Sequence, residues 1–208
     1  MPNNYATIAQ VKAHMPDGKL DSVTTYDAII TELCIRASRA IDSHLKRKPG
    51  AFSMDTDETR YYDGSGCAEQ WIDELAGAPT TVSVAETGDL TSYTAWSSTD
   101  WYPWPPNALL DGLPYQRLDL DTLYGSKALW YRFRKSIKVV GPFGFSAAVP
   151  DELEEAAIIQ VVRWLKRGQQ GFQDVGAIAN LGQLRYVKKL DPDIANLIDL
   201  PRFQRVTI

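Results

Sequence analysis

The sequence contains few of the side chains on which active sites and metal sites are built. Its 208 residues include only two cysteines, Cys34 and Cys67, and two histidines, His14 and His44. The histidines lie far apart without a further ligand at metal-binding spacing, which argues against a zinc site. Two cysteines do not define a disulfide framework. We predict that Cys34, inside a helical pattern, is a core residue and that Cys67, after a glycine turn, is exposed.

Long apolar runs are absent as well. No stretch approaches the roughly 18 apolar residues of a membrane span. The N-terminal stretch MPNNYATIAQVKAHM lacks the basic segment and apolar run of a signal peptide. The formal net charge of −4 is too small to indicate a general attraction to nucleic acid or membranes. We therefore expect an intracellular globular protein without membrane contact, built as one domain or as one domain with a sizeable insertion.

Nucleotide-binding and catalytic motifs are also missing. The turn DGSG at 63–66 lacks the later Gly-Lys-Ser/Thr of a phosphate-binding loop, and GPFG at 141–144 lacks the spacing of a dinucleotide fingerprint. No serine stands in a Gly-x-Ser-x-Gly elbow. We predict no catalytic residue, no cofactor and no metal, and hence a protein that is not an enzyme.

Helical patterns occupy both ends of the chain. Thr7 can cap a short helix over 7–15, and a longer helix is expected from Thr25, a candidate cap, to about Lys46. The apolar face of the longer helix recurs at helical spacing. Its members are Ile29, Ile30, Leu33, Ala37, Ile41 and Leu45.

The C-terminal part predicts two further helices and a tail. One helix follows Pro150, is acidic at its start and basic at its end, and is expected to stop at Gly168 and Gly171. A short one follows Asp191, a candidate cap, and ends before Pro201. The tail RFQRVTI is basic, aromatic and β-prone and has no obvious burial in its own chain, so it suits docking onto a partner.

Residues 51–147 have a different character, with short runs of β-formers between turns. The segment 59–66 is typical of a strand that runs into a turn, whereas the prolines of WYPWPPNALLDGLP at 101–114 favour a long loop. The other strand candidates are 71–75, 81–87, 92–99, 115–121, 128–134 and 137–141. The sequence therefore predicts an α+β protein. A helical bundle from 1–50 and 148–208, including the docking tail, is split by an inserted antiparallel β domain at 51–147.

Four aromatic residues, Trp96, Trp101, Tyr102 and Trp104, form the most unusual local feature. Three interpretations stay open for them. They pack within a core or loop, they anchor a protein–protein contact, for which tryptophan and tyrosine are well suited, or they stack on a sugar or a base. Under the second interpretation, Trp101, Tyr102 and Trp104 form a partner-contact loop.

Charged side chains gather at two places in the β-rich stretch. Asp119 and Asp121 alternate with leucines, which favours the solvent face of a strand over a glycosidase-type carboxylate pair. In WYRFRKSIKVV the alternation puts two arginines on one strand face, which is solvated or contacts an acidic protein surface or a DNA backbone. No DNA-reading motif accompanies them. This basic cluster consists of Arg132, Arg134, Lys135 and Lys138.

In their order, these segments resemble the head–tail connector (adaptor) proteins of long-tailed bacteriophages. The resemblance rests on YATIAQVKAHM, on AIITELCIRASRAIDSHLKR followed by TRYYDGSG, on VVGPFGFSAAVPDELEEAAIIQVVRWLKRG and on LDPDIANLIDLPRF. Each stretch is weakly specific alone, and the order and spacing are more specific together. The insertion at 51–147 departs from the all-helical members, although longer members also carry β insertions.

The resemblance implies a structural virion protein of the neck, assembled in the host cytoplasm. Such a protein forms a homo-oligomeric ring, typically a dodecamer, beneath the portal protein. It joins the capsid to a stopper or tail-completion protein and lets non-specific duplex DNA pass through its lumen. Its C-terminal segment docks on the portal. Carried onto this chain, the docking residues are Leu197, Leu200, Arg202, Phe203, Arg205 and Val206.

Two alternative functions stay open. A neighbouring stopper or tail-completion protein would be mainly β, which the long helical segments argue against. A carbohydrate-binding module or glycosidase would use the tryptophans, and Trp101→Ala or Trp104→Ala would then abolish a glycan-array or hydrolysis signal.

The mild net charge suits a DNA conduit, because a strongly basic lumen would trap DNA through counterion release. Tight, salt-dependent DNA binding by an isolated ring would contradict that last hypothesis.

Overall fold

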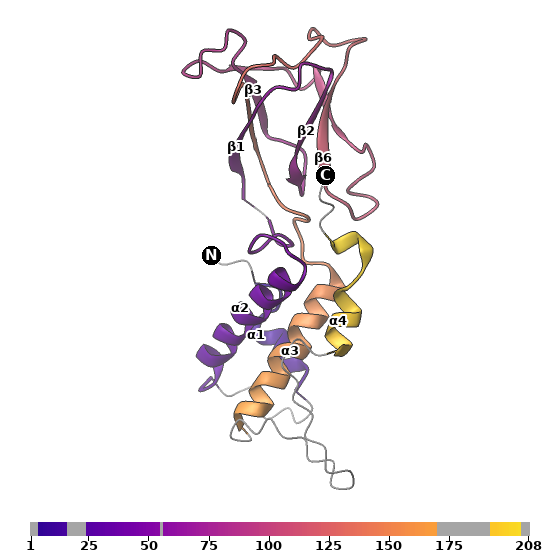
Figure 1. Cartoon of the computed structure of the whole chain (residues 1–208). Helices are drawn as coiled ribbons and strands as arrows, with labels where there is room; N and C mark the ends of the chain where they lie inside the picture. Colours follow the sequence, from indigo (N-terminus) through magenta and orange to yellow (C-terminus); the bar gives the residue numbers. More distant parts are fainter. Residues whose placement is uncertain (1–3, 16–23, 55, 170–191, 205–208) are drawn as a thin grey trace. The chain divides into compact units, whose positions relative to one another are not determined.

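The helices and the strands of the chain form two compact units. The computed structural model describes residues 4–15, 24–54, 56–169 and 192–204. One unit, here called the helical unit, combines Met1–Gly50 with Val149–Ile208, and the other, the β unit, is Ala51–Ala148 (Figure 1). Because the chain contains helices and two antiparallel sheets, the α+β class expected from the sequence is confirmed.

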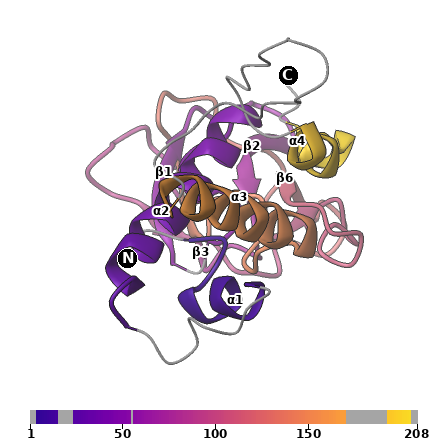
Figure 2. The ribbon, with the colours of Figure 1, turned by 90° about the horizontal axis from the view of Figure 1, so that it is seen from below.

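The described part of the helical unit contains four α-helices and one 3-10 helix. These are α1 (Ile8–Ala13), α2 (Asp27–His44), α3 (Asp151–Gln169), α4 (Pro192–Ile198) and η1 (Pro201–Phe203). α2 packs against α3, α1 lies against both, and α4 packs against α3. Figure 2 shows α3 between α2 and α4. The central helix α3 therefore connects all the others.

The first two helices begin in different ways. Thr7 caps α1 as predicted: its hydroxyl accepts a hydrogen bond from Gln10 N at 3.3 Å, and Gln10 Oε1 accepts one from Thr7 N at 2.8 Å. The prediction that Thr25 caps α2 is wrong, since that helix begins at Asp27 without a side-chain cap. The Asp27 carboxylate instead complements the helix dipole and pairs with Lys12 at 2.6 Å.

α2 buries a narrower face than its apolar pattern suggested. Ile29, placed on that face by the sequence, is exposed, whereas its neighbour Ile30 is fully buried. Consecutive helical residues point about 100° apart, so only one of the two can face α3 and α1. The buried face of the helix consists of Ile30, Cys34, Ala37, Ser38, Ile41 and Asp42.

Asp42 holds the two ends of the first helical segment together. Its buried carboxylate accepts hydrogen bonds from the Tyr5 hydroxyl and from Gly50 N, the latter at 3.0 Å, and pairs with Arg39 at 3.3 Å. Tyr5 N also donates to Ser38 Oγ at 2.9 Å. Burial raises the pKa of Asp42, and these hydrogen bonds and the Arg39 charge oppose the shift.

The C-terminal segment is more closely packed than the sequence indicated. The prediction that the tail has no burial in its own chain is wrong for Phe203, which is fully buried and whose carbonyl accepts a hydrogen bond from Arg47 Nε at 2.9 Å. Arg202 pairs with Glu152 of α3. Gly168 does not stop α3, which continues to Gln169. The predicted stop at Gly171 and the predicted cap Asp191 lie outside the described residues.

Two antiparallel sheets form the β unit. The four-stranded sheet has the order β1-β7-β3-β4 and the three-stranded sheet the order β2-β6-β5. The inner faces of both sheets share one core, in which Trp96 and Trp130 stack with their ring centroids 5.0 Å apart. The strands are β1 (Glu58–Tyr62), β2 (Glu69–Leu75), β3 (Thr81–Val84), β4 (Thr94–Ala95), β5 (Trp101–Trp104), β6 (Tyr115–Leu120) and β7 (Ile137–Gly141).

Two predictions about this unit are wrong. The segment 128–134 is not a strand, because its backbone bonds to the glycine turn instead: Trp130 N donates to Cys67 O at 2.9 Å, and Gly66 N donates to Trp130 O at 3.0 Å. The start of the predicted loop 101–114 is the strand β5. Proline is tolerated there because β5 lies at the edge of its sheet and pairs on one side only.

The two ends of the β unit pair with each other. Ala51 O accepts hydrogen bonds from Phe145 N at 2.7 Å and Ser146 N at 3.4 Å, and Met54 N donates to Ser146 O at 3.0 Å. The rings of Phe52 and Phe145 pack with centroids 5.1 Å apart. This end clamp, defined as residues 51–54 and 143–146, closes the unit at the point where the chain enters and leaves it.

We predict that Gly144→Ala opens the end clamp. An added Cβ would lie 2.2 Å from Met54 Cγ and 2.8 Å from the Ala51 carbonyl oxygen, so the backbone must shift. We expect a loss of about 1–3 kcal/mol in the free energy of unfolding, measured by urea denaturation. Gly77→Ala is the matched control, because its Cβ would meet only the Pro142 ring, at 3.2 Å. An equal effect of both substitutions would show that the clamp has no special role.

We also predict that one of the two cysteines reacts in the native protein. Cys67 is exposed, whereas burial raises the pKa of the Cys34 thiol to about 11. A chromogenic disulfide reagent at neutral pH should therefore titrate one thiol rapidly in the native chain and two after denaturation. Cys67→Ser is the control, because Cys34 is then the one thiol left. Rapid titration of both thiols in the native chain would contradict a closed core around α2.

Candidate interaction surfaces

The four aromatic residues singled out in the sequence are divided between the inside and the outside of the β unit. Trp96 and Trp101 are buried, whereas Tyr102 is 43% and Trp104 39% exposed. The alternation of β5 explains this division, since successive side chains of a strand point to opposite faces. Packing is thus the role of the first pair, and contact with a partner is open only to the second.

The outer face of the three-stranded sheet collects six aromatic and charged side chains. The strand register places Trp71, Arg117 and Trp104 side by side in one row. The next row contains Glu69, Asp119 and Tyr102. We call these two rows the aromatic–arginine face: Glu69, Trp71, Tyr102, Trp104, Arg117 and Asp119.

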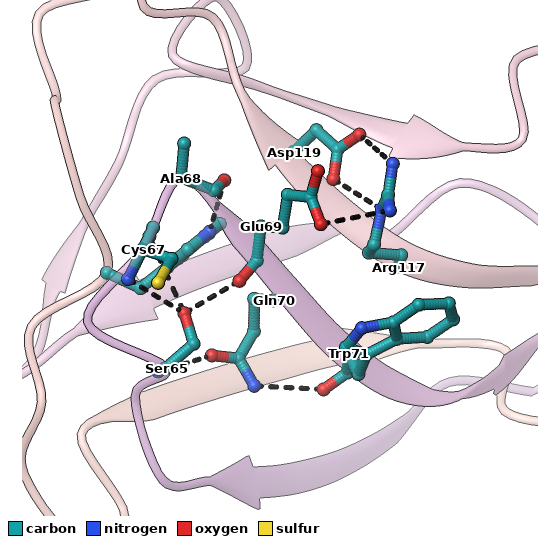
Figure 3. Close-up of polar contacts among 9 residues, drawn as sticks. Ser65, Cys67, Ala68, Glu69, Gln70, Trp71, Arg117 and Asp119 are labelled. Atoms are coloured by element: carbon teal, nitrogen blue, oxygen red, sulfur yellow. Dashed lines mark hydrogen bonds and ion pairs between the residues drawn. The ribbon is translucent and has the colours of Figure 1, made fainter. Parts of the chain in front are cut away.

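Arg117 is the centre of this face. Its Nη2 donates to Asp119 Oδ2 at 2.7 Å, its Nε lies 2.7 Å from Asp119 Oδ1, and its Nη1 donates to Glu69 at 3.1 Å (Figure 3). The guanidinium carbon lies 5.4 Å from the Trp71 ring centroid and 5.1 Å from that of Trp104. The indoles thus flank a cation that two carboxylates already neutralise, and the surface they present is aromatic without excess positive charge.

The two aspartates of this strand do not lie on a solvated face as predicted. Asp119 is on the outer side but only 6% exposed, because Arg117 covers it. Asp121 follows the end of β6, where its carboxylate accepts hydrogen bonds from Leu123 N at 3.0 Å and Tyr124 N at 2.9 Å. One aspartate therefore anchors the arginine, and the other shapes a loop.

The DGSG turn positions β2 at the edge of this face. Ser65 Oγ donates to Glu69 O at 2.6 Å, and Ser65 N donates to Gln70 Oε1 at 2.9 Å (Figure 3). Gln70 Nε2 then donates to Trp71 O at 2.9 Å. The turn therefore fixes the start of the strand that carries Glu69 and Trp71, consistent with its interpretation as a turn.

Apolar side chains at loop tips are a second surface feature, which the sequence analysis missed. Leu110, in the loop between β5 and β6, is 88% exposed, and Leu123 and Tyr124 after β6 are 77% and 85% exposed. In a monomer such side chains gain nothing from folding, and grouped exposed apolar residues are typical of protein contacts. The signal in the sequence was a leucine pair between turn residues. Such a pair does not by itself indicate whether the leucines are exposed at a loop tip or buried in a core.

The predicted basic cluster lies on a loop and on the strand that follows it. Arg132, Arg134 and Lys135 are exposed on the loop before β7, and Lys138 is half-buried on β7 itself. The prediction that Arg132 and Arg134 share a strand face is wrong, because no strand forms there. The four residues are close together in the chain, on one loop and the start of the next strand.

The predicted docking residues are only partly available at the surface. Arg202 is exposed, Leu197 and Leu200 are half-buried, and Phe203 is buried. The remaining two, Arg205 and Val206, lie outside the described residues. The docking role of the set stays a prediction, and the Phe203 side chain is buried.

The described ranges contain neither a metal-binding cluster nor a membrane-spanning helix. Among these residues, histidine, cysteine, aspartate and glutamate nowhere gather in a group of three or more that could hold a metal ion. Within the same ranges, none of the helices has the length and apolar character needed to cross a membrane.

Comparison with known proteins gave similarity in structure only. No protein-family model and no curated protein sequence matches the chain. A chain in the neck of an empty gene transfer agent (GTA) particle, computed with C6 symmetry, superposes with a TM-score of 0.56 at 13% identity, covering 96% of this chain and 89% of the other. The two chains therefore share a fold. A chain in the neck of the native GTA particle, computed with C12 symmetry, gives 0.50 at 14% identity, with coverages of 88% and 85%.

Arg117 offers a direct test of how the aromatic–arginine face is held. Arg117→Met leaves the Asp119 carboxylate buried and unpaired, so we expect a loss of about 3 kcal/mol in the free energy of unfolding. Adding Asp119→Leu should recover most of that loss. Arg36→Met, which removes an exposed pair with Glu32, should change stability by less than about 0.5 kcal/mol. Equal effects of Arg117→Met and Arg36→Met would contradict the geometry.

Proposed function

We propose that the chain is a structural component of a virion neck, a head–tail connector (adaptor) that forms a homo-oligomeric ring beneath the portal. In this role it joins the capsid to a stopper or tail-completion protein and lets DNA pass. The observation that carries the proposal is the fold, shared over nearly the whole chain, both units included, with a chain from a GTA neck. The symmetries of the two neck structures, C6 and C12, favour a ring.

The surfaces of the β unit suit such a ring. A cyclic assembly needs two different surfaces on each copy, one for each neighbour. The aromatic–arginine face is rich in aromatic side chains, and the loops with Leu110 and with Leu123 and Tyr124 expose apolar side chains. Tryptophan, tyrosine and arginine are the side chains that most often dominate binding energy at protein interfaces. These two surfaces are therefore our candidates for the contacts between neighbouring copies.

The C-terminal segment supports the portal contact in a modified form. Arg202, Leu197 and Leu200 stay candidates for docking, together with Arg205 and Val206, which follow them in the sequence. Phe203 is better explained as the anchor that fixes the end of α4 and η1 to the helical unit, since its ring is buried. The segment would then present its residues to the portal from a fixed position, which lowers the entropy cost of docking.

Carbohydrate binding is the second candidate, favoured by the two exposed indoles, Trp71 and Trp104, on one sheet face. Trp101 is buried, so Trp101→Ala tests folding rather than sugar binding. We expect Trp101→Ala to cost about 3–5 kcal/mol and Trp104→Ala about 1 kcal/mol in unfolding experiments. A glycan-array signal lost in a folded Trp104→Ala variant would favour the second candidate.

The ring is tested by particle mass and shape. Mass photometry and negative-stain imaging of the chain, alone and with the portal protein of its particle, should give rings of about twelve copies, either alone or on the portal. Deleting residues 205–208 should weaken portal binding and leave the fold intact, because the buried Phe203 stays in place.

The matched control is a deletion from residue 190 onward. It removes α4 and Phe203, so we expect it to lower the free energy of unfolding as well as portal binding. A chain that stays monomeric with and without the portal, and that is indifferent to both deletions, would overturn the adaptor proposal.

A further inference from the structure

The loop before β7 carries cations that no carboxylate of the described residues neutralises. We call residues 131–136 together with Lys138 the basic loop. None of its four cationic side chains forms an ion pair with a described residue, and Arg132, Arg134 and Lys135 are exposed. Elsewhere in the β unit, cations are paired: Arg60 binds Glu58 and Asp73, Arg117 binds Glu69 and Asp119, and Lys127 binds Glu86.

The backbone of the basic loop is firmly held. Phe133 O accepts a hydrogen bond from Gly64 N at 3.1 Å, Lys135 N donates to Asp63 Oδ1 at 2.7 Å, and Lys135 O accepts one from the Tyr93 hydroxyl at 2.9 Å. Gly64 lies so close that a Cβ there would be 1.8 Å from Tyr131 O. The backbone of the loop is thus preorganised, which lowers the entropy cost of binding. Its charged side chains are not paired with any described residue.

Aromatic side chains lie among these cations. Phe133 is 42% exposed and stacks on Tyr131 with centroids 6.4 Å apart. Lys138 Nζ lies 6.0 Å from the Tyr93 ring centroid. Asp63 is the carboxylate that contacts the loop, and it accepts from a backbone N–H rather than from a side-chain cation. The four cations therefore leave a clear positive excess at this place.

We propose that the basic loop is the contact site for the phosphate backbone of duplex DNA. The inference rests on the proposed function, because it names the surface of the neck protein that meets the passing DNA. Phosphates are recognised by free lysine and arginine side chains and require no base-reading motif. With only four cations in the basic loop of a chain whose net charge is −4, each contact is weak and salt-sensitive, so the DNA is guided and can still slide.

The test compares two triple variants of the full chain. R132Q/R134Q/K135Q removes three charges from the basic loop. R36Q/K46Q/K166Q removes three exposed charges from the helical unit and matches it closely, since Lys46 and Lys135 both have positive φ, 55° and 52°. Fluorescence anisotropy with a labelled duplex of mixed sequence, between about 50 and about 200 mM salt, measures the affinity and its salt dependence.

We expect the wild-type chain and the helical-unit variant to bind alike. In the loop variant the slope of log K against log salt should fall in magnitude by about 0.9 for each contacting cation removed, so by up to about 2.7. Gly64→Ala, which keeps every charge but displaces the loop, should weaken binding in the same direction. Binding that is undetectable at about 50 mM salt, or equal in both triple variants, would overturn the proposal.

One further outcome distinguishes DNA from an acidic protein surface. If the loop variant binds DNA like the wild type but no longer gives rings, the basic loop is a protein contact and the DNA assignment is wrong. Ring formation is measured separately by mass photometry. A failure of DNA binding with intact rings would therefore overturn this inference and leave the neck function standing. A chain that binds DNA but stays monomeric both alone and with the portal would overturn the neck function alone.

Discussion

The end clamp of the β unit is the constraint on which the rest of the structure depends. The helical unit is built from two segments that the whole β unit separates in sequence, and bringing distant segments together costs loop-closure entropy. Because Ala51 bonds directly to Phe145 and Ser146, the inserted unit closes its own ends. Its folding therefore shortens the effective chain length between the end of α2 and the start of α3. The loop-closure entropy that opposes packing of these two helices is lowered accordingly.

Within the β unit, the two surfaces that contain arginine differ in whether their cations are paired with carboxylates. Arg117 is covered by two indoles and neutralised by two carboxylates, so it stabilises an aromatic surface and gives it no net charge. Arg132 and Arg134 have no such partners among the described residues. The backbone of their loop is held by other contacts, such as the hydrogen bond from Lys135 N to Asp63. The first arrangement suits a protein partner and the second a polyanion, as the differing cost of burying paired and free charges requires.

Local patterns were enough to predict much of the fold. The Thr7 cap of α1, the dipole-matched α3 and strands such as β7 follow from spacing and from residue type within a few positions. The predictions that failed depend on distant partners. The segment 128–134 has strand-forming residues, but its hydrogen bonds go to the glycine turn at 64–67. Phe203 is buried, and its carbonyl accepts a hydrogen bond from Arg47, far away in sequence.

The candidate surfaces were harder to predict for the same reason. Trp71 and Trp104 flank Arg117 only because β2 and β5 lie on either side of β6, and no spacing within one strand indicates that order. The basic cluster was found from sequence, since its four cations are close together, but its freedom from ion pairs became visible only in three dimensions. Local charge density was thus predictable, whereas pairing across the sheet was not.

Electron microscopy of particles made without this chain tests the neck function most directly. A connector is needed at one joint only, so its removal should leave both halves of the particle formed but unjoined. We expect tailless heads and free tails in the absence of the chain, and complete particles when it is restored. Complete tailed particles in normal number without the chain would contradict a role in the neck.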